Sequence, residues 1–235
     1  MQYIRKNDIP PADWDSWFID DTSLRSYDYR SLPSPHLAKQ FLITEQNGLC
    51  AYCQMEINTN NSSIEHVIPY SLNVPLSTCY HNLVAVCTNF TKDSSNRLYC
   101  EKARGNLLLP PIIFYQDFTC PTGSNYKYFS SEADGTISAN VKAYKNDSEW
   151  NVHMQIVALI DILNLNHENL KRKREEILNV WWDLLIGKTP KQQQAFWVKK
   201  FEDIQNDLNQ PFRQFLLIYL RKKNGFGIGA IIVAE

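Results

Sequence analysis

The chain lacks several features that would assign it to whole classes of protein. None of its apolar stretches approaches the roughly 20 residues that a membrane-spanning helix requires. Residues 1–8 contain no apolar core of a secretory signal peptide, so we expect a cytoplasmic protein without a membrane partner. Reducing conditions there favour thiolate ligands or free thiols over disulfides for the six cysteines.

The chain also lacks a basic excess. Its 24 Lys and Arg residues and 25 Asp and Glu residues give a net charge of −1. Proteins that hold long nucleic acids unaided usually carry a clear positive charge, because neutralising phosphates supplies their affinity. A nucleic-acid enzyme with this composition needs either locally concentrated positive charge or a partner. Basic clusters do occur, and we interpret each as a solvated helix face: 171–174, 199–200 and 221–223.

The composition is otherwise that of a folded protein. Hydrophobic residues make up 44% of the chain and aromatic residues 12%, which is ample for a buried core. At 235 residues, the chain is either one large domain or a small module within helical flanks.

Hydrophobic spacing and turn residues predict an α+β fold that is mainly helical towards its C-terminus. Residues 1–34 read as an irregular arm with a short helix. The spacing over 36–43 predicts a helix that Asn47-Gly48 ends with a left-handed cap. Residues 55–86 look like strands and loops, and Asp134-Gly135 predicts a hairpin near 126–141.

Helices are expected from residue 149 onward. One covers 152–163, and Asn166 is the expected cap of a second, which Gly187 and Pro190 end. Two more are predicted over 191–208 and 211–223, and residues 228–233 form a strand or a docking tail. We expect these residues to form the helical core: Trp181, Trp182, Leu184, Trp197, Phe201 and Phe212.

Four of the cysteines have the spacing of a zinc site. Cys50-Ala51-Tyr52-Cys53 is a Cys-x2-Cys turn, and Cys87 and Cys100 follow with a longer polar insert between them. Four thiolates suit one tetrahedral zinc ion, which would join the two distant segments. The alternative is six unrelated buried thiols, and we interpret Cys79 and Cys120 in that way.

A Glu-His pair lies between these cysteine pairs, in Ile64-Glu65-His66-Val67-Ile68-Pro69. A histidine takes a proton from water near neutral pH, and a carboxylate holds a hard cation such as Mg²⁺ or Mn²⁺. Neighbours on a strand point to opposite faces, so the strand must end or twist here if both act on one substrate.

Together these residues resemble the HNH nuclease superfamily, whose site is a β-hairpin and a helix around one metal ion. Glu65-His66, the central Asn82 and Glu101 after the last cysteine match its pattern in order, across about residues 49–106. Arg104-Gly105 stands where Lys-Gly is common, and Glu101 stands where Asp or Asn is more usual.

Three further segments resemble one particular group of HNH proteins. Residues 1–6, 81–87 and 163–170 look like the PtuB HNH proteins of Septu anti-phage systems and some retron loci. That family works beside PtuA, an ABC-type ATPase, so the resemblance implies a PtuA-like partner and a nucleic-acid substrate, either DNA or RNA. A retron reverse transcriptase with its RNA–DNA is a further candidate partner.

The resemblance implies metal-assisted phosphodiester hydrolysis. His66 deprotonates the attacking water, and Glu65 and Glu101 hold one divalent cation. Asn82 orients the histidine or ties down the hairpin, while Lys102 and Arg104 contact phosphate. We interpret His81, His153 and His167 as structural.

Two other functions fit the same residues. The four cysteines could shape a nucleic-acid- or protein-binding surface without catalysis, or the chain could be a ribonuclease toxin. The expected organisation is an arm and helix over 1–48, the nuclease module over 49–110, a hairpin connector over 111–148, and a helical partner-docking domain over 149–235.

Overall fold

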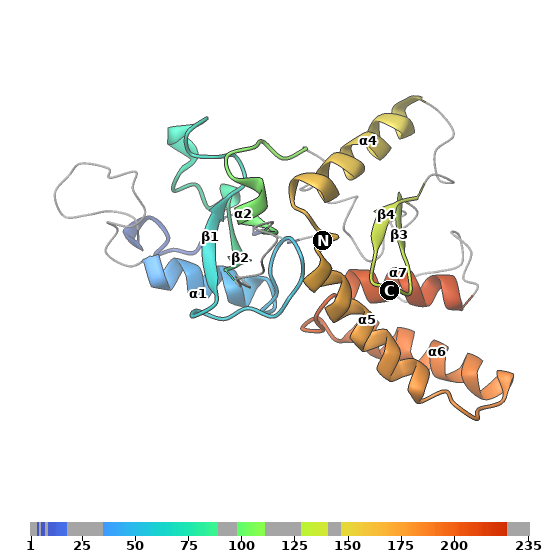
Figure 1. Ribbon diagram of the computed structural model, residues 1–235. Helices are drawn as coiled ribbons and strands as arrows, with labels where there is room; N and C mark the ends of the chain where they lie inside the picture. Colours follow the sequence, from blue (N-terminus) through green and yellow to red (C-terminus); the bar gives the residue numbers. More distant parts are fainter. Residues whose placement is uncertain are drawn as a thin grey trace.

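The computed structural model describes residues 4, 6–7, 9–17, 35–88, 98–110, 128–140 and 147–224. Figure 1 shows two groups of elements in this part of the chain, with α1, β1, β2 and α2 on one side and α5–α7 with a second hairpin on the other. None of the described helices is both long enough and apolar enough to cross a bilayer.

The first group is built around a two-stranded antiparallel sheet. Strand β1 (Ser62–His66) pairs with β2 (Leu83–Cys87), with Ser62 opposite Cys87 and His66 opposite Leu83. All five residues of β2 are buried, as its unbroken apolar sequence requires. Short 3-10 turns, η3 (Val74–Leu76) and η4 (Tyr80–Asn82), lie in the loop between the strands.

Helix α1 (Pro35–Glu45) packs on this sheet through Ala38 and Leu42, both fully buried. Asn47 and Gly48 have φ angles of 55° and 71°, and the Gly48 N–H donates to the Ile43 carbonyl at 2.9 Å. The left-handed cap expected here is confirmed. It turns the chain directly into the cysteine pair at 50–53. The short helix α2 (Glu101–Arg104) follows Cys100.

The second group is mainly helical. It contains α4 (Asp147–Ile162), α5 (Glu168–Asp183), α6 (Pro190–Asn206) and α7 (Arg213–Lys223). The predicted hairpin is confirmed as β3 (Phe129–Ser131) and β4 (Ile137–Ala139), which pack against α7 and α4 respectively. In the arm, the described part contains the 3-10 turn η1 (Asp15–Trp17).

Helix ends differ from the sequence-based expectation in two places. His167, not Asn166, caps α5, because its Nδ1 accepts from the Asn169 N–H at 3.2 Å. The Asn166 side chain instead bonds both backbone groups of Ile137, at 2.8 and 2.9 Å, and so fixes the hairpin to the helices. Pro190 does not merely end the preceding helix but begins α6, behind a Thr189 capping box.

The core prediction needs three corrections. Leu184 is 53% exposed, and Trp182 is 38% exposed even though its ring packs edge-to-face on Trp197 and its Nε1 donates to the Tyr219 hydroxyl at 3.2 Å. Conversely, Arg174 is only 2% exposed, although the cluster 171–174 was expected to be solvated. The expectations for Cys120 and residues 228–233 lie outside the described residues.

Candidate metal centre and active site

The sulfur atoms of Cys50, Cys53, Cys87 and Cys100 form one cluster, within 4.8 Å of one another. A tetrahedral zinc with bonds of about 2.3 Å places its sulfur ligands about 3.8 Å apart. The Cys50–Cys100 and Cys53–Cys87 sulfur distances are 4.0 and 3.7 Å. All four residues are buried, so the expected thiolate cluster fits a structural zinc ion in number, spacing and seclusion.

Three elements deliver these sulfurs. The turn after α1 supplies Cys50 and Cys53, the end of β2 supplies Cys87, and Cys100 stands directly before α2. Cys100 has φ 58° and ψ −132°, a backbone conformation that costs free energy for any residue with a side chain. A metal–thiolate bond would offset that cost. Cys79 is a half-buried free thiol outside the cluster.

His66 is the last residue of β1 and is half-buried, not sealed in the interior. Its Nε2 lies 2.8 Å from the Ser77 carbonyl oxygen, which can only accept, so Nε2 carries the ring proton. That leaves Nδ1 with a lone pair. Burial lowers the pKa of His66, the charge of Arg104 lowers it further, and the bond to Ser77 opposes both. The ring is thus held as a neutral imidazole able to accept a proton.

Asn82 holds the loop that positions His66. Its Oδ1 accepts from the Ile68 N–H at 2.7 Å, and its Nδ2 donates to the carbonyls of Ile68 and Leu76, each at 3.0 Å. The Ser77 carbonyl that holds His66 follows Leu76 directly. Asn82 is buried, and these bonds are those of a residue that ties down the hairpin.

Glu65 points into the module, where Arg104 pairs with it. The Arg104 guanidinium and the Tyr52 hydroxyl both donate to Glu65 Oε1, the latter at 3.3 Å. Burial, opposed by the charge of Arg104 and reinforced by that of Glu101, raises the pKa of Glu65 to about 7. The negative charge of Glu101 acts on Glu65, so the two carboxylates lie near each other.

Arg104 does not have the position of a phosphate contact. It is 2% exposed and donates to the carbonyls of His66, Val67 and Leu107 at 2.7–2.8 Å, as well as to Glu65 and Tyr52. The expectation that Arg104 binds substrate is therefore corrected: this guanidinium joins α2 to the end of β1. Lys102, two residues earlier on α2, is exposed.

Glu65 and Glu101 each leave one carboxylate oxygen available to a divalent cation. Ser63 donates to Glu101 Oε2 at 2.7 Å, and Glu65 uses Oε1, so each carboxylate keeps one oxygen without a hydrogen-bond partner among the described residues. Hard oxygen donors completed by water suit Mg²⁺ or Mn²⁺. In the described ranges, however, Glu65, His66 and Glu101 do not form a compact three-ligand group as the cysteines do.

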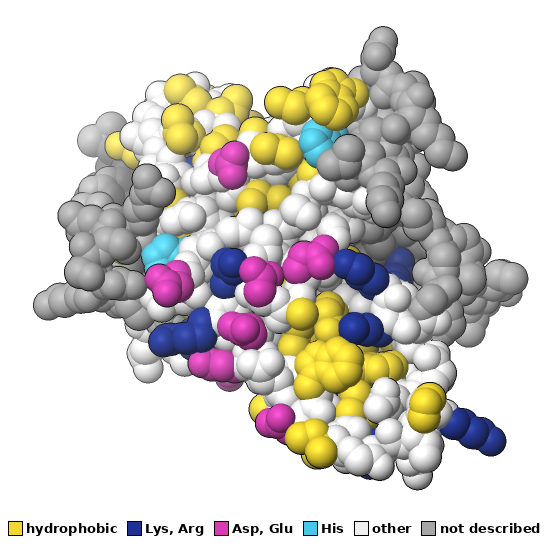
Figure 2. Space-filling model, turned by 45° about the vertical axis from the view of Figure 1, so that its right-hand side comes forward, with side chains coloured by type: hydrophobic (Ala, Val, Ile, Leu, Met, Phe, Trp, Pro, Cys, Tyr) yellow, Lys and Arg dark blue, Asp and Glu magenta, His cyan; other side chains and the backbone are white. Residues whose placement is uncertain are grey.

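The loop that follows His66 carries no charged side chain. Residues 67–80 contain no Lys, Arg, Asp or Glu, and Tyr70 and Leu72 are 53% and 61% exposed. The Tyr70 ring lies 6.2 Å from the His66 ring. On the face drawn in Figure 2, acidic and basic side chains are interspersed and form no basic stripe. A nucleic acid would therefore gain little affinity from phosphate neutralisation on this face.

The other expected histidines have structural contacts. His81 is exposed, and its Nε2 lies 3.0 Å from the Asn7 carbonyl. His153 stacks on Trp150 with ring centroids 4.9 Å apart, and His167 caps α5. The sequence analysis did not identify Tyr52 and Ser77 as residues that support the site, nor Arg174 as a buried residue. Of these, only Arg174 has a position in the hydrophobic pattern that indicates burial. It lies four residues after Leu170 and four before Leu178, on the buried side of α5.

No family model matches the chain. It is similar to a protein named "Retron Vc95 putative HNH endonuclease" from Vibrio cholerae serotype O1 biovar El Tor, with 29% identity over 145 residues. The match covers 59% of this chain and 63% of that protein. The likeness supports the HNH nuclease resemblance, and the name places that relative in a retron.

Proposed function

We propose that this chain is an HNH-type nuclease that hydrolyses phosphodiester bonds, acting as the effector of an anti-phage defence system. The observation that carries the proposal is the half-buried His66 at the end of β1, with Nε2 bonded to the Ser77 carbonyl and Nδ1 left to accept a proton. The retron HNH relative supports the same chemistry.

In the proposed reaction, Nδ1 of His66 removes a proton from the water that attacks phosphorus. Asn82 keeps the Ser77 loop in place so that the imidazole does not rotate. Arg104 keeps Glu65 at the end of β1 and acts through position, not through contact with substrate. A divalent cation held by Glu65 and Glu101 would withdraw charge from the phosphoryl oxygen and stabilise the leaving oxygen.

We propose a PtuA-like ABC-type ATPase as the partner, within a PtuB-like Septu or retron system in the cytoplasm. The charge distribution supports a partner, because a chain with net charge −1 and an uncharged loop beside the histidine gains little affinity from phosphates. The reverse transcriptase and its RNA–DNA remain a second candidate partner.

The test is His66→Ala in the complete system, with plasmid DNA and total RNA as separate substrates. Cleavage should vanish while zinc content and melting temperature stay near those of the unaltered protein. His81→Ala is the matched control, because His81 is an exposed histidine of the same module, and it should cut normally. A His66→Ala protein that cuts at the normal rate refutes the mechanism.

A zinc-stapled binding module without catalysis is the competing function, favoured by the compact cysteine cluster alone. Manganese titration into zinc-loaded protein separates the two. The nuclease should bind a second metal ion, and Glu101→Gln should weaken that binding. A binding module should take up zinc alone and shift nucleic acid in a gel without cutting it. Cleavage of total RNA but not plasmid identifies a ribonuclease.

A further inference from the structure

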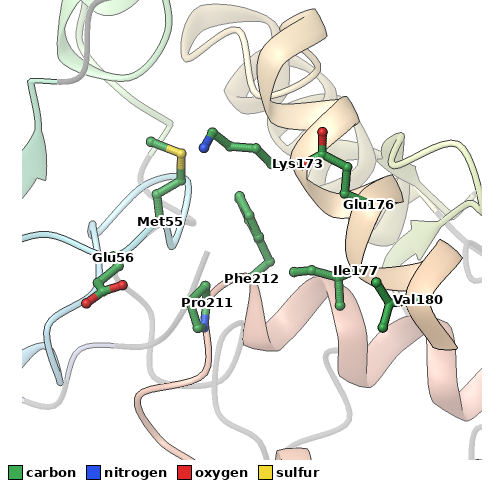
Figure 3. Close-up of a pocket in the computed structure, with 8 residues that line it drawn as sticks. All are labelled: Met55, Glu56, Lys173, Glu176, Ile177, Val180, Pro211 and Phe212. Carbon is green, nitrogen blue, oxygen red and sulfur yellow. The ribbon is translucent and has the colours of Figure 1, made fainter.

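Two segments that are distant in the sequence contact the first group of elements from different sides. On one side, helices α5 and α7 face the loop after Cys53 across a groove of about 510 Å³, which Figure 3 shows. On the other side, the N-terminal arm with η1 lies beside α1, away from α5–α7 (Figure 1). The arm contacts the loop whose Ser77 carbonyl holds His66, and is therefore the one of these two segments that reaches the candidate active site.

Trp14 makes the inner contact of the arm with this loop. Trp14 is 2% exposed, and its Nε1–H donates to the Thr78 carbonyl at 2.9 Å. Thr78 directly follows Ser77, whose carbonyl oxygen lies 2.8 Å from Nε2 of His66. Because each peptide unit is planar, only the two backbone torsions of Thr78 separate these two carbonyls. Holding the Thr78 carbonyl therefore restricts the direction of the Ser77 carbonyl.

The indole of Trp14 is itself held in a fixed position. The Trp14 backbone N–H donates to the Pro11 carbonyl at 2.9 Å, which closes the turn before η1. The indole ring lies edge-on to the rings of Phe41 and Tyr80, with centroids 6.2 and 5.1 Å apart. A ring packed between α1 and the loop gives its N–H a defined direction toward Thr78.

A second part of the arm contacts the end of the same loop. The Asn7 N–H donates to the Tyr80 hydroxyl at 3.2 Å, and the Asn7 carbonyl lies 3.0 Å from Nε2 of His81. Lys6 pairs with Glu45 of α1 at 2.6 Å, and its Nζ lies 4.4 Å from the centroid of the Tyr80 ring. The His81 contact is exposed and the other two are partly buried, so loss of His81 leaves the arm attached.

The loop is thus held on both sides of Ser77. The Leu76 carbonyl accepts from the Asn82 side chain at 3.0 Å, and the Thr78 carbonyl accepts from the indole. With the carbonyls before and after it bonded to other elements, the Ser77 carbonyl keeps its direction toward His66. The tautomer of His66 therefore depends on the arm as well as on the hairpin.

We infer that Trp14 is a positioning residue of the candidate active site, whose indole N–H keeps the Ser77 carbonyl on Nε2 of His66. The inference adds a residue of the arm to a site whose other members come from residues 52–104. It deepens the proposed function, and its effect on cleavage rests on that function. Its effect on the His66 ring does not involve cleavage.

The first experiment records the ¹⁵N signals of the His66 ring in the zinc-loaded full chain at pH 8.5, where an ordinary histidine is neutral. The signals are assigned by their loss in His66→Ala. In Trp14→Phe the ring loses its fixed acceptor and exchanges between tautomers, so the signals of its two nitrogens should move toward each other. Trp17→Phe should leave them in place. It is the matched control because the Trp17 ring lies 5.6 Å from that of Trp14, and its N–H has no hydrogen-bond partner among the described residues.

A second variant separates the N–H from the size of the ring. Benzothienylalanine at position 14 keeps the shape of the indole and carries sulfur in place of the N–H group. It should move the His66 signals as Trp14→Phe does, and it decides the question if Trp14→Phe does not fold. His66 signals that stay in place in the benzothienylalanine protein overturn the inference.

The second experiment measures cleavage by the complete system. Trp14→Phe should lower kcat about 10-fold, since misplacing a catalytic group by about 1 Å costs up to about 100-fold. KM should change less than about twofold, because no contact with substrate is lost. Trp17→Phe should retain both values. If His66→Ala abolishes cleavage and Trp14→Phe has the normal kcat, the inference is wrong. A His66→Ala protein that cuts normally instead refutes the proposed function, and the ring signals still test the contact from Trp14.

Discussion

Replacing Arg104 by Met tests whether this guanidinium holds the candidate active site together. The variant loses every hydrogen bond of a side chain that is 2% exposed, including those to Glu65, Tyr52 and three backbone carbonyls. It also leaves a carboxylate buried without its cation. Breaking a buried ion pair by removing one partner costs about 3–5 kcal/mol. That is a large part of the about 5–15 kcal/mol that stabilises a typical domain.

The stability that Arg104→Met loses should depend on pH in a defined direction. Burial raises the pKa of Glu65 to about 7 even with Arg104 present, and Arg104 is the main group that lowers it. Without Arg104 the folded-state pKa rises further above its unfolded value near 4.5. Since the folded variant then holds its proton more tightly than the unfolded chain does, its free energy of unfolding falls as pH increases. The difference from the unaltered protein should therefore be larger at pH 8.5 than at pH 6.

The assay is urea unfolding of the zinc-loaded protein at both pH values. Arg172→Met is the control, because the Arg172 side chain is 64% exposed and its Glu176 partner lies 3.8 Å away, so its loss should cost less than about 0.5 kcal/mol. In a Glu65→Gln background, Arg104→Met should cost about 1–3 kcal/mol less. The buried-pair argument would be refuted if Arg104→Met lowered the free energy of unfolding by less than about 1 kcal/mol at pH 8.5. It would also be refuted if the loss were the same in the unaltered protein and in the Glu65→Gln background.

Four further outcomes follow from the geometry. Gly135→Ala should destabilise the protein by at least about 2 kcal/mol in urea unfolding, because its Cβ would lie 2.1 Å from the Lys171 carbonyl oxygen. Gly187→Ala, at a similar φ but with nothing within 4 Å, should lose only about 1 kcal/mol, and equal losses would contradict the steric argument. Asn82→Ala should reduce kcat about 10-fold or more with a melting temperature that remains measurable, since it frees the loop carrying the Ser77 carbonyl; unchanged kcat would exclude a positioning role. For His66, the acidic limb of the kcat/KM profile should lie below pH 6.5, because the pKa of the free enzyme's histidine is lowered; a limb above 6.5 would contradict this assignment. Tyr70→Ala should raise KM and Tyr70→Phe should not, if an exposed ring beside His66 stacks on a base; equal KM values would exclude stacking.

Much of the local structure followed from short-range chemistry. Asn47-Gly48 ended α1 because only residues that tolerate positive φ can form that cap. Asp134-Gly135 formed the turn of the second hairpin for a related reason. The spacing of Cys50 and Cys53 indicated a metal ligand pair, since two sulfurs on one tight turn reach a common ion.

Long-range contacts could not be inferred in this way. Nothing near Arg104 in the sequence shows that its guanidinium turns inward to Glu65 and not outward to a phosphate, because that choice depends on packing between α2 and β1. Likewise, Ser77 reaches His66 only because Asn82 folds the intervening loop back.

By itself, the sequence determined which residue types are available for chemistry: four thiolates at ligand spacing and a Glu-His pair between them. Only the tertiary structure decided how they are used. It gathered sulfurs from three elements, fixed the tautomer of His66 with a carbonyl eleven residues away, and buried two arginines that local pattern had assigned to solvent or substrate. The physical reason is that a buried charge takes its role from the partners that folding brings to it, and those partners are distant in the chain.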